Sequence, residues 1–245
     1  MPAGAGNRCV MLEHGYLEFL TPMGDTPIAS QLRTAIKRYT GPHLIALGTS
    51  APESDHARLT KEGFAPLDLV ALQREICTPS GTGTARFTLV RVPPGTMAEG
   101  RIQFCRHHTP ELLWQPRWTQ HANGAVALKG VVLCVADPQE AARRFGRYSG
   151  LLAQVSGGVW RIGTARGHLL FLDQNNLQRR FDVVPPSLPW IAGCVLESED
   201  IAATGNIIRR SETPVQALDG GRLLVKLPPA VGGIIVFEKG GQVLH

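Results

Sequence analysis

The sequence predicts a mixed α+β fold built from tandem βαβββ modules, and two observations lead to this prediction. A short apolar run, a helix cap and an amphipathic helix recur over residues 43–64, 131–150 and 191–212. Each recurrence is followed by short runs rich in β-branched residues and separated by turn residues, a pattern typical of strands. Apolar residues make up 43% of the 245 residues, so the chain can bury a sizeable core.

Each of the three predicted helices has a residue suited to cap its start. Ser50 and Glu53 have the spacing of a capping box. Asp137 precedes a proline in the first turn of the second helix, and Asp200 precedes the third. Gly150 is placed to end the second helix. Each recurrence is therefore predicted as one β-α-β-β-β unit.

A fragment of a fourth unit lies before the first complete one. Residues 8–12 and 16–20 are predicted as two strands of a closing hairpin. A helix is expected from Thr26 to Gly41, because apolar residues of this segment recur on one helical face. Prolines and tryptophans between residues 108 and 124 mark a connector, which predicts two domains over residues 1–121 and 122–245.

Composition and charge exclude several classes of protein. The net charge is +5, but the basic residues form only short pairs and aromatics are 6%, which does not indicate a nucleic-acid partner. No apolar run approaches the roughly 18 to 20 residues of a membrane span, and the start lacks a signal-peptide pattern. Five cysteines without a CxxC pair indicate reduced thiols, so we expect a cytoplasmic protein.

Four stretches resemble the glyoxalase-like family of the vicinal oxygen chelate superfamily. They are NRCVMLEHGYLE at 7–18, CRHHTPELLW at 105–114, NGAV at 123–126 and VVLCVAD at 131–137. The resemblance implies that paired modules form half-open, cup-shaped sheets with the active site inside. It does not imply a substrate, because the superfamily includes isomerases, dioxygenases, lyases, epimerases and binding proteins.

The resemblance also implies that the first module is truncated. Similar proteins begin earlier, with a strand and a helix that would precede Met1 here. A strand at 16–20 would then lack a neighbour, and an uncovered edge invites pairing with another chain. We therefore expect a homodimer.

Enzymes of this superfamily hold a divalent ion with residues of the first and last strands of each module. In the second half these positions fall on Gly130, Leu170, Gly193 and Val236, which predicts a cup without a metal. In the first half, the resemblance assigns metal ligation to Glu18 and His43, and Gln103 would bind the ion or the substrate. Oxygen and imidazole donors suit Ni, Mn, Zn, Fe or Mg, which the sequence does not distinguish.

Two histidines follow Gln103 along the same predicted strand. His107 and His108 are the candidate proton carriers, since imidazole titrates near neutrality, and Trp114 is a candidate wall of the substrate site. The alternative is that the histidine pair caps the strand end, that His43 hydrogen-bonds locally and that Glu18 is solvated.

Three hypotheses of function follow. The first is a small-molecule enzyme in the first cup, in which a divalent ion stabilises an enolate-like intermediate. The second is a metal-free protein that binds a small molecule between tryptophans, namely Trp114, Trp118, Trp160 and Trp190. The third is a structural or partner-binding protein without catalysis.

Overall fold

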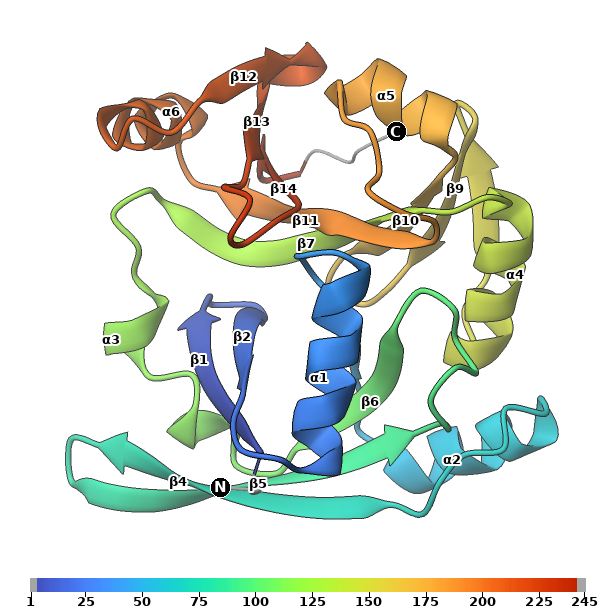
Figure 1. Cartoon of the computed structure of the whole chain (residues 1–245). Helices are drawn as coiled ribbons and strands as arrows, with labels where there is room; N and C mark the ends of the chain where they lie inside the picture. Colours follow the sequence, from blue (N-terminus) through green and yellow to red (C-terminus); the bar gives the residue numbers. More distant parts are fainter. Residues whose placement is uncertain (1–3, 242–245) are drawn as a thin grey trace.

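The computed structural model describes residues 4–241, and its first half contains a hairpin, two helices and a small sheet (Figure 1). The elements are β1 (Ala5–Met11), β2 (Tyr16–Pro22), α1 (Pro27–Arg38), β3 (Leu44–Gly48), α2 (Pro52–Lys61), β4 (Val70–Thr78), β5 (Gly81–Arg91) and β6 (Arg101–His107). β1 and β2 form a separate antiparallel pair, and the four-stranded sheet has the order β3-β6-β5-β4. β3 is therefore an edge strand, parallel to β6.

The second half forms one eight-stranded sheet after a connector with η1 (Pro110–Leu112) and α3 (Pro116–Thr119). Its elements are β7 (Ala125–Cys134), α4 (Pro138–Ser149), β8 (Ala153–Ser156), β9 (Val159–Gly163), β10 (His168–Leu172), α5 (Gln174–Phe181), β11 (Trp190–Ser198), α6 (Ile201–Arg210), β12 (Val215–Leu218), η2 (Asp219–Gly221), β13 (Arg222–Lys226) and β14 (Ile234–Lys239). The order is β12-β13-β14-β11-β7-β10-β9-β8, with β7 and β11 antiparallel at the centre. Two βαβββ modules meet there, which confirms the predicted fold class.

The predicted caps are confirmed at two helices and wrong at a third. The Asp137 carboxylate accepts hydrogen bonds from the backbone of Gln139 and Glu140, and Asp200 caps α6 in the same way. The predicted capping box at Ser50 does not form. Since α2 begins at Pro52, the cap position falls on Ala51, which has no side-chain acceptor.

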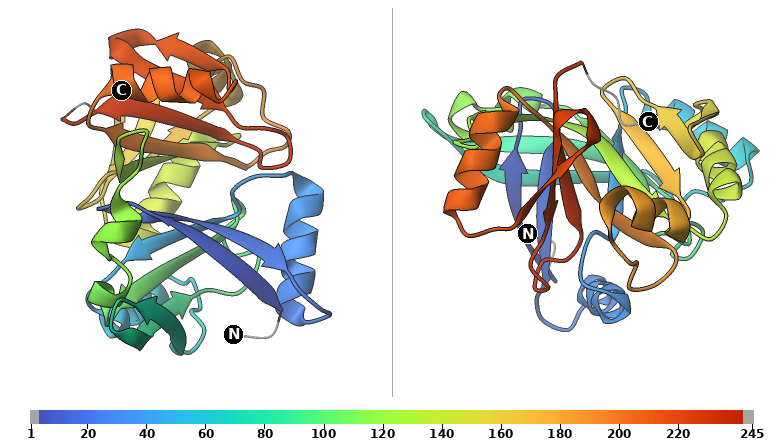
Figure 2. Two further views of the ribbon diagram at one scale, coloured as in Figure 1. Left: turned by 90° about the vertical axis from the view of Figure 1, so that its left-hand side faces the viewer. Right: turned by 90° about the horizontal axis from the view of Figure 1, so that it is seen from above.

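The two halves share one apolar core. The outer face of β6 contributes Ile102 and Phe104, which pack with Leu133, Phe145 and Tyr148 of the second half. The Tyr148 ring stacks on Phe104 at 5.3 Å, and its hydroxyl donates to the Ile102 carbonyl at 2.7 Å. Figure 2 shows the first half stacked against the eight-stranded sheet. Burial across this contact fixes the first half against the second.

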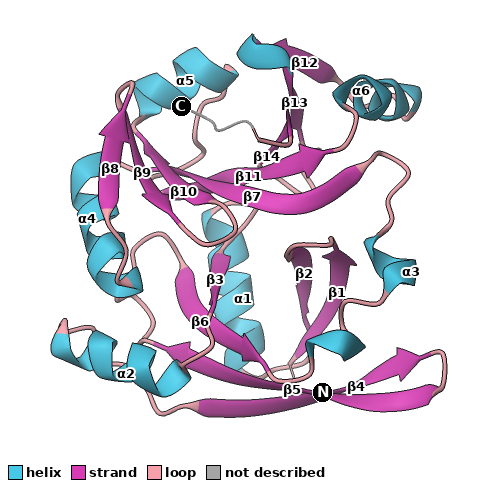
Figure 3. Cartoon of the chain, turned by 180° about the vertical axis from the view of Figure 1, so that it is seen from behind, coloured by secondary structure: helices cyan, strands magenta, loops and turns pink. Residues whose placement is uncertain are grey.

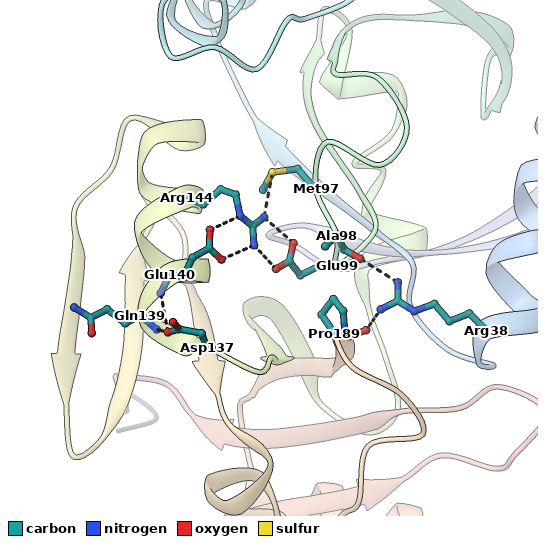
Figure 4. A network of polar contacts seen from close by, with 9 residues as sticks. All are labelled: Arg38, Met97, Ala98, Glu99, Asp137, Gln139, Glu140, Arg144 and Pro189. Atoms are coloured by element: carbon teal, nitrogen blue, oxygen red, sulfur yellow. Dashed lines mark hydrogen bonds and ion pairs between the residues drawn. The ribbon is translucent and has the colours of Figure 1, made fainter.

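Polar contacts reinforce the junction at one edge (Figure 4). Arg144 on α4 donates two hydrogen bonds to the buried carboxylate of Glu99, with N–O distances of 2.8 and 3.0 Å, and also pairs with Glu140. Arg38 at the end of α1 donates to the carbonyls of Ala98 and Pro189. At the opposite side, the turn of the β1–β2 hairpin bonds to β7, where the Leu128 amide donates to the His14 carbonyl.

Two of the positions in the second cup that the resemblance aligned with metal ligands are apolar and buried. Leu170 and Val236 are fully buried in a cluster that includes Leu177 and Phe181 of α5. The side chains of Leu170 and Val236 offer no donor atom to a metal. Among residues 4–241, no helix has the length and apolar character needed to cross a bilayer.

Candidate functional site

An open cleft of about 3650 Å³ lies between the first half and the eight-stranded sheet of the second half. Its walls are the β1–β2 hairpin, α1 and the inner face of β6, and the loop of residues 164–167 between β9 and β10 closes one side. Gln103, Cys105 and His107 of β6 border the cleft, and Ile102 and Phe104, which alternate with them along the strand, pack into the shared core. The cleft thus includes the side of the first half on which the sequence analysis placed the candidate site.

Four side chains surround His107 on the cleft wall, and we call these five residues the His107 cluster. The Tyr16 hydroxyl lies 3.4 Å from His107 Nε2, and Cys105 Sγ lies 3.9 Å from the same atom. Two rings contact the imidazole edge to face, Trp114 at 5.1 Å and Phe87 at 5.3 Å between ring centroids. The hairpin, β5, β6 and the connector each contribute to this cluster.

Burial sets the protonation state of the His107 cluster. Desolvation lowers the pKa of His107, and the nearby charge of Arg166 lowers it further. Desolvation raises the pKa of the Tyr16 phenol well above its usual range, and it raises the pKa of the Cys105 thiol to about 12. At neutral pH the cluster thus presents a neutral imidazole beside a protonated phenol and a protonated thiol. This arrangement suits proton transfer better than nucleophilic attack by a thiolate.

Glu18 borders the same cleft, two residues beyond Tyr16 on β2. It is exposed and accepts a hydrogen bond from Asn7 Nδ2 at 2.7 Å. Its negative charge contributes to the raised pKa values of both Tyr16 and Cys105. The structure therefore brings Glu18 into the electrostatic surroundings of the His107 cluster.

His43 lies directly before β3 and makes a local contact. Its ring stacks on Tyr39 at 4.0 Å, and Nε2 lies 2.8 Å from the Tyr39 carbonyl oxygen. A carbonyl only accepts, so Nε2 carries the proton and Nδ1 is the nitrogen left to bind another group. Burial lowers the pKa of His43, which keeps the ring neutral. This is the local hydrogen bond expected as the alternative to metal ligation.

Gln103 is buried in the middle of β6, between Ala46 on β3 and Arg91 on β5. Its Oε1 atom has no hydrogen-bond partner within residues 4–241. A buried amide oxygen without a partner costs about 1–3 kcal/mol, which a ligand donor at this wall would recover. The role of Gln103 in orienting a bound molecule stays a prediction.

His108 points away from the cleft that His107 borders. It is exposed, and its Nε2 lies 2.8 Å from the Thr88 hydroxyl. Tyr16 and Arg166 are the site residues that sequence reasoning did not select. Strand alternation with Glu18 could have indicated Tyr16, but Arg166 comes from the other half and only the three-dimensional fold places it near His107.

Comparisons with known proteins find the same fold in solved structures. The chain is similar in structure to a hypothetical protein from Staphylococcus aureus, with a TM-score of 0.65 and 10% identity over 97% of this chain and 86% of that chain. It is also similar to a catechol 2,3-dioxygenase, with a TM-score of 0.50 and 13% identity over 84% of this chain and 73% of that chain. At these identities the likenesses show the fold alone. The comparison with curated protein sequences finds no match.

The sequence itself matches one family. The sequence profile of the glyoxalase-like domain covers residues 1–149, which is more than half of the chain and includes the whole His107 cluster. The chain therefore belongs to the glyoxalase-like domain family.

Proposed function

We propose that the cleft binds a small anionic carbonyl compound and that His107 moves a proton on it. The observation that carries this proposal is the convergence of Tyr16 and Cys105 on His107 Nε2, at 3.4 and 3.9 Å. A general base must be unprotonated at the working pH, and the lowered pKa of His107 meets this requirement. The ring of Trp114 offers an apolar surface beside it.

The charge around the cleft favours an anionic substrate. Arg166 is exposed, borders the cleft and lies close enough to His107 to lower its pKa. No salt bridge of Arg166 occurs among residues 4–241, whereas Lys129 at the same side pairs with Glu197. A carboxylate held by Arg166 would place its neighbouring carbon near His107.

The proposed step is an enolisation. His107 accepts the proton from the carbon next to the substrate carbonyl, so that the C–H bond breaks and an N–H bond forms. The electron pair of that bond becomes the C=C bond of the enolate, and the carbonyl oxygen takes the negative charge. The Tyr16 hydroxyl donates a hydrogen bond to this oxygen, and return of the proton from His107 completes the exchange.

The residues present do not fit a resident metal ion. Within residues 4–241, no group of three His, Cys, Asp or Glu side chains is placed to hold one. Glu18, His43 and the Gln103 amide oxygen are the three donors that the sequence predicted, and His43 Nε2 is already bonded to the Tyr39 carbonyl. With a single carboxylate among them, these three donors make a weak site for a divalent ion, which takes four to six or more ligands. The proton transfer that we propose therefore uses neither Glu18 nor His43.

Deuterium exchange tests the proposal. The protein would be incubated in D₂O with a panel of 2-oxo carboxylates, and loss of the C3–H signal would be followed by NMR. We expect exchange with the unaltered chain, a fall of about 100-fold or more in His107→Gln, and no change in His56→Gln on α2. Exchange at equal rates in the unaltered chain and His107→Gln would contradict the proposal.

Treatment with a chelator distinguishes this reaction from a metal-dependent one. We expect exchange to continue after treatment with EDTA and in the His43→Ala variant. Loss of exchange on chelation, with recovery on adding Mn²⁺, Ni²⁺ or Zn²⁺, would instead support the ion predicted at Glu18 and His43.

A further inference from the structure

One side of β6 carries a row of side chains that extends beyond the His107 cluster. Strand alternation gives this side four residues, all of which border the cleft, namely Arg101, Gln103, Cys105 and His107. At the usual rise of about 3.3 Å per residue, the Cα atoms of Arg101 and His107 lie roughly 20 Å apart. The cleft therefore has a second polar end, which the proposed proton transfer does not use.

A second arginine lies beside Arg101. Arg91 is directly opposite Gln103 in the β5–β6 ladder, on the side of β5 from which Phe87 and Leu89 border the cleft. It is therefore the diagonal neighbour of Arg101, at a Cα separation of about 7–8 Å that long side chains can bridge. Burial lowers the pKa of Arg101, and the charge of Arg91 lowers it further. We call Arg91 and Arg101 the arginine pair.

The positive charge of the arginine pair is not neutralised by the protein. Among residues 4–241, neither guanidinium forms an ion pair with a carboxylate. Arg101 Nη2 donates a hydrogen bond of 2.6 Å to the Gln31 amide oxygen on α1, which carries no charge. Figure 3 shows β3 and β6 side by side in front of this helix. Two like charges held close together on neighbouring strands favour the binding of an anion.

Hydrogen-bonding capacity is also left over between the arginine pair and the His107 cluster. Gln103 is only 9% exposed, and neither its Oε1 atom nor the buried Nε of Arg91 has a partner within residues 4–241. The two residues are direct cross-strand neighbours, yet these two atoms do not bond to each other. Buried polar atoms without partners are unfavourable. A ligand that accepts from Arg91 and donates to Gln103 would therefore be stabilised here.

We propose that the arginine pair is a second anion subsite of the cleft and that the substrate is an elongated dianion. This inference rests on the proposed function, which places a carboxylate at Arg166 and the reacting carbon at His107. The second carboxylate or phosphate group accepts hydrogen bonds from the arginine pair. A hydroxyl or amide N–H between the two ends donates to Gln103 Oε1. Short 2-oxo monocarboxylates occupy only the His107 end.

Binding of matched ligands tests the proposal. Isothermal titration calorimetry would compare 2-oxo monocarboxylates of increasing chain length with analogues that carry a carboxylate or a phosphate monoester at the far end. We expect the second anion to tighten binding at least about tenfold at a matching chain length. The analogue that gains more identifies the preferred anion. Equal affinities of monoanions and dianions at every chain length would overturn the proposal.

Variants of the arginine pair locate the second anion. We expect Arg101→Gln and Arg91→Gln each to remove the gain for dianions and to leave the affinity for monocarboxylates unchanged. Arg210→Gln, which removes the same charge at the exposed end of α6, is the control and should keep the gain. A gain that persists in both Arg101→Gln and Arg91→Gln would overturn the proposal.

Inorganic phosphate separates the subsite from catalysis. Titrated alone and followed by NMR, it should shift the signals of the Arg101 guanidinium and the Gln103 side-chain amide before those of His107. Such shifts, together with the gain for dianions, support the subsite even if no ligand exchanges deuterium, a failure that would contradict only the proposed function. Phosphate that shifts the His107 signals and leaves those of Arg101 in place would overturn the subsite.

Discussion

Single buried groups decide the chemistry that each half can perform. In the first half, desolvation keeps His107 neutral and Tyr16 protonated, which makes a pair suited to proton transfer. In the second half, Glu238 is 1% exposed at the end of β14, and neither carboxylate oxygen has a partner within residues 4–241. It faces Arg222 on β13, Glu197 on β11, Lys129 on β7 and Arg161 on β9, yet burial still raises its pKa to about 7.

Glu238 therefore makes stability depend on pH. Between pH 4.5 and 7 the carboxyl is protonated in the folded chain and ionised in the unfolded chain, so folding takes up a proton. Stability from this group is complete below pH 4.5 and falls by about 3 kcal/mol as the pH rises to 7. We expect Glu238→Gln to be more stable than the unaltered chain at pH 8 and to lose this dependence.

Urea unfolding at pH 4.5, 6 and 8 measures the effect. Glu199→Gln, which changes an exposed carboxylate of the same half, is the control and should leave the profile unchanged. If the free energy of unfolding of Glu238→Gln changes with pH in parallel with that of the unaltered chain, Glu238 is ionised in the folded protein.

At the scale of elements, the starts of the helices show which features the sequence could predict and which it could not. Asp137 and Asp200 cap their helices as predicted, because an aspartate just before the first turn acts through local geometry alone. The Ser50 prediction failed, because α2 begins at Pro52 and the cap position moved to Ala51. β8 and α5 were not predicted, since each is short and α5 has only Leu177 and Phe181 as its apolar face.

This difference predicts two stability effects. Asp137→Ala removes the acceptor for two backbone amides and should lower the free energy of unfolding by about 1 kcal/mol. Ser50→Ala should change it by less than about 0.5 kcal/mol, because Ser50 caps nothing. Chemical denaturation of the two variants under the same condition measures both changes in the free energy of unfolding. A larger loss in Ser50→Ala than in Asp137→Ala would show that the helix starts are misplaced.

The strands that carry the candidate site could be predicted from the sequence, but the contacts between its side chains could not. Alternation along β6 predicted Gln103 and His107 on one face, and Ile102 and Phe104 between them belong to the core cluster. The approach of Arg166 to His107 depends on how the halves pack, which no local pattern encodes. The stacking of His43 on Tyr39 likewise depends on how the chain turns between α1 and β3.

At the scale of the whole molecule, the predicted division at residues 121 and 122 separates module pairs that share a core. Tyr148 of the second half packs against Phe64 and Phe104 of the first and bonds to the Ile102 carbonyl. Two halves joined in this way should unfold in one cooperative transition. We expect the proposed division to describe architecture rather than separate folding units.

Tyr148→Ala tests this coupling. Removal of a fully buried aromatic ring should cost about 3–5 kcal/mol and should speed amide exchange in both sheets equally. Hydrogen exchange followed by mass spectrometry would measure both sheets in one experiment. Faster exchange restricted to the second half would show that the halves unfold independently.

The central claim is that the cleft holds a small anion against a neutral His107. Its most direct measurement is NMR of histidine-labelled protein, which reports the imidazole itself and does not depend on turnover. On addition of a 2-oxo carboxylate at pH 7, we predict that the His107 signals shift saturably while those of His56 stay in place, and that Arg166→Ala abolishes the shift. His107 signals that do not respond to any member of the panel, or that show a charged imidazole at pH 7 without ligand, would contradict the account.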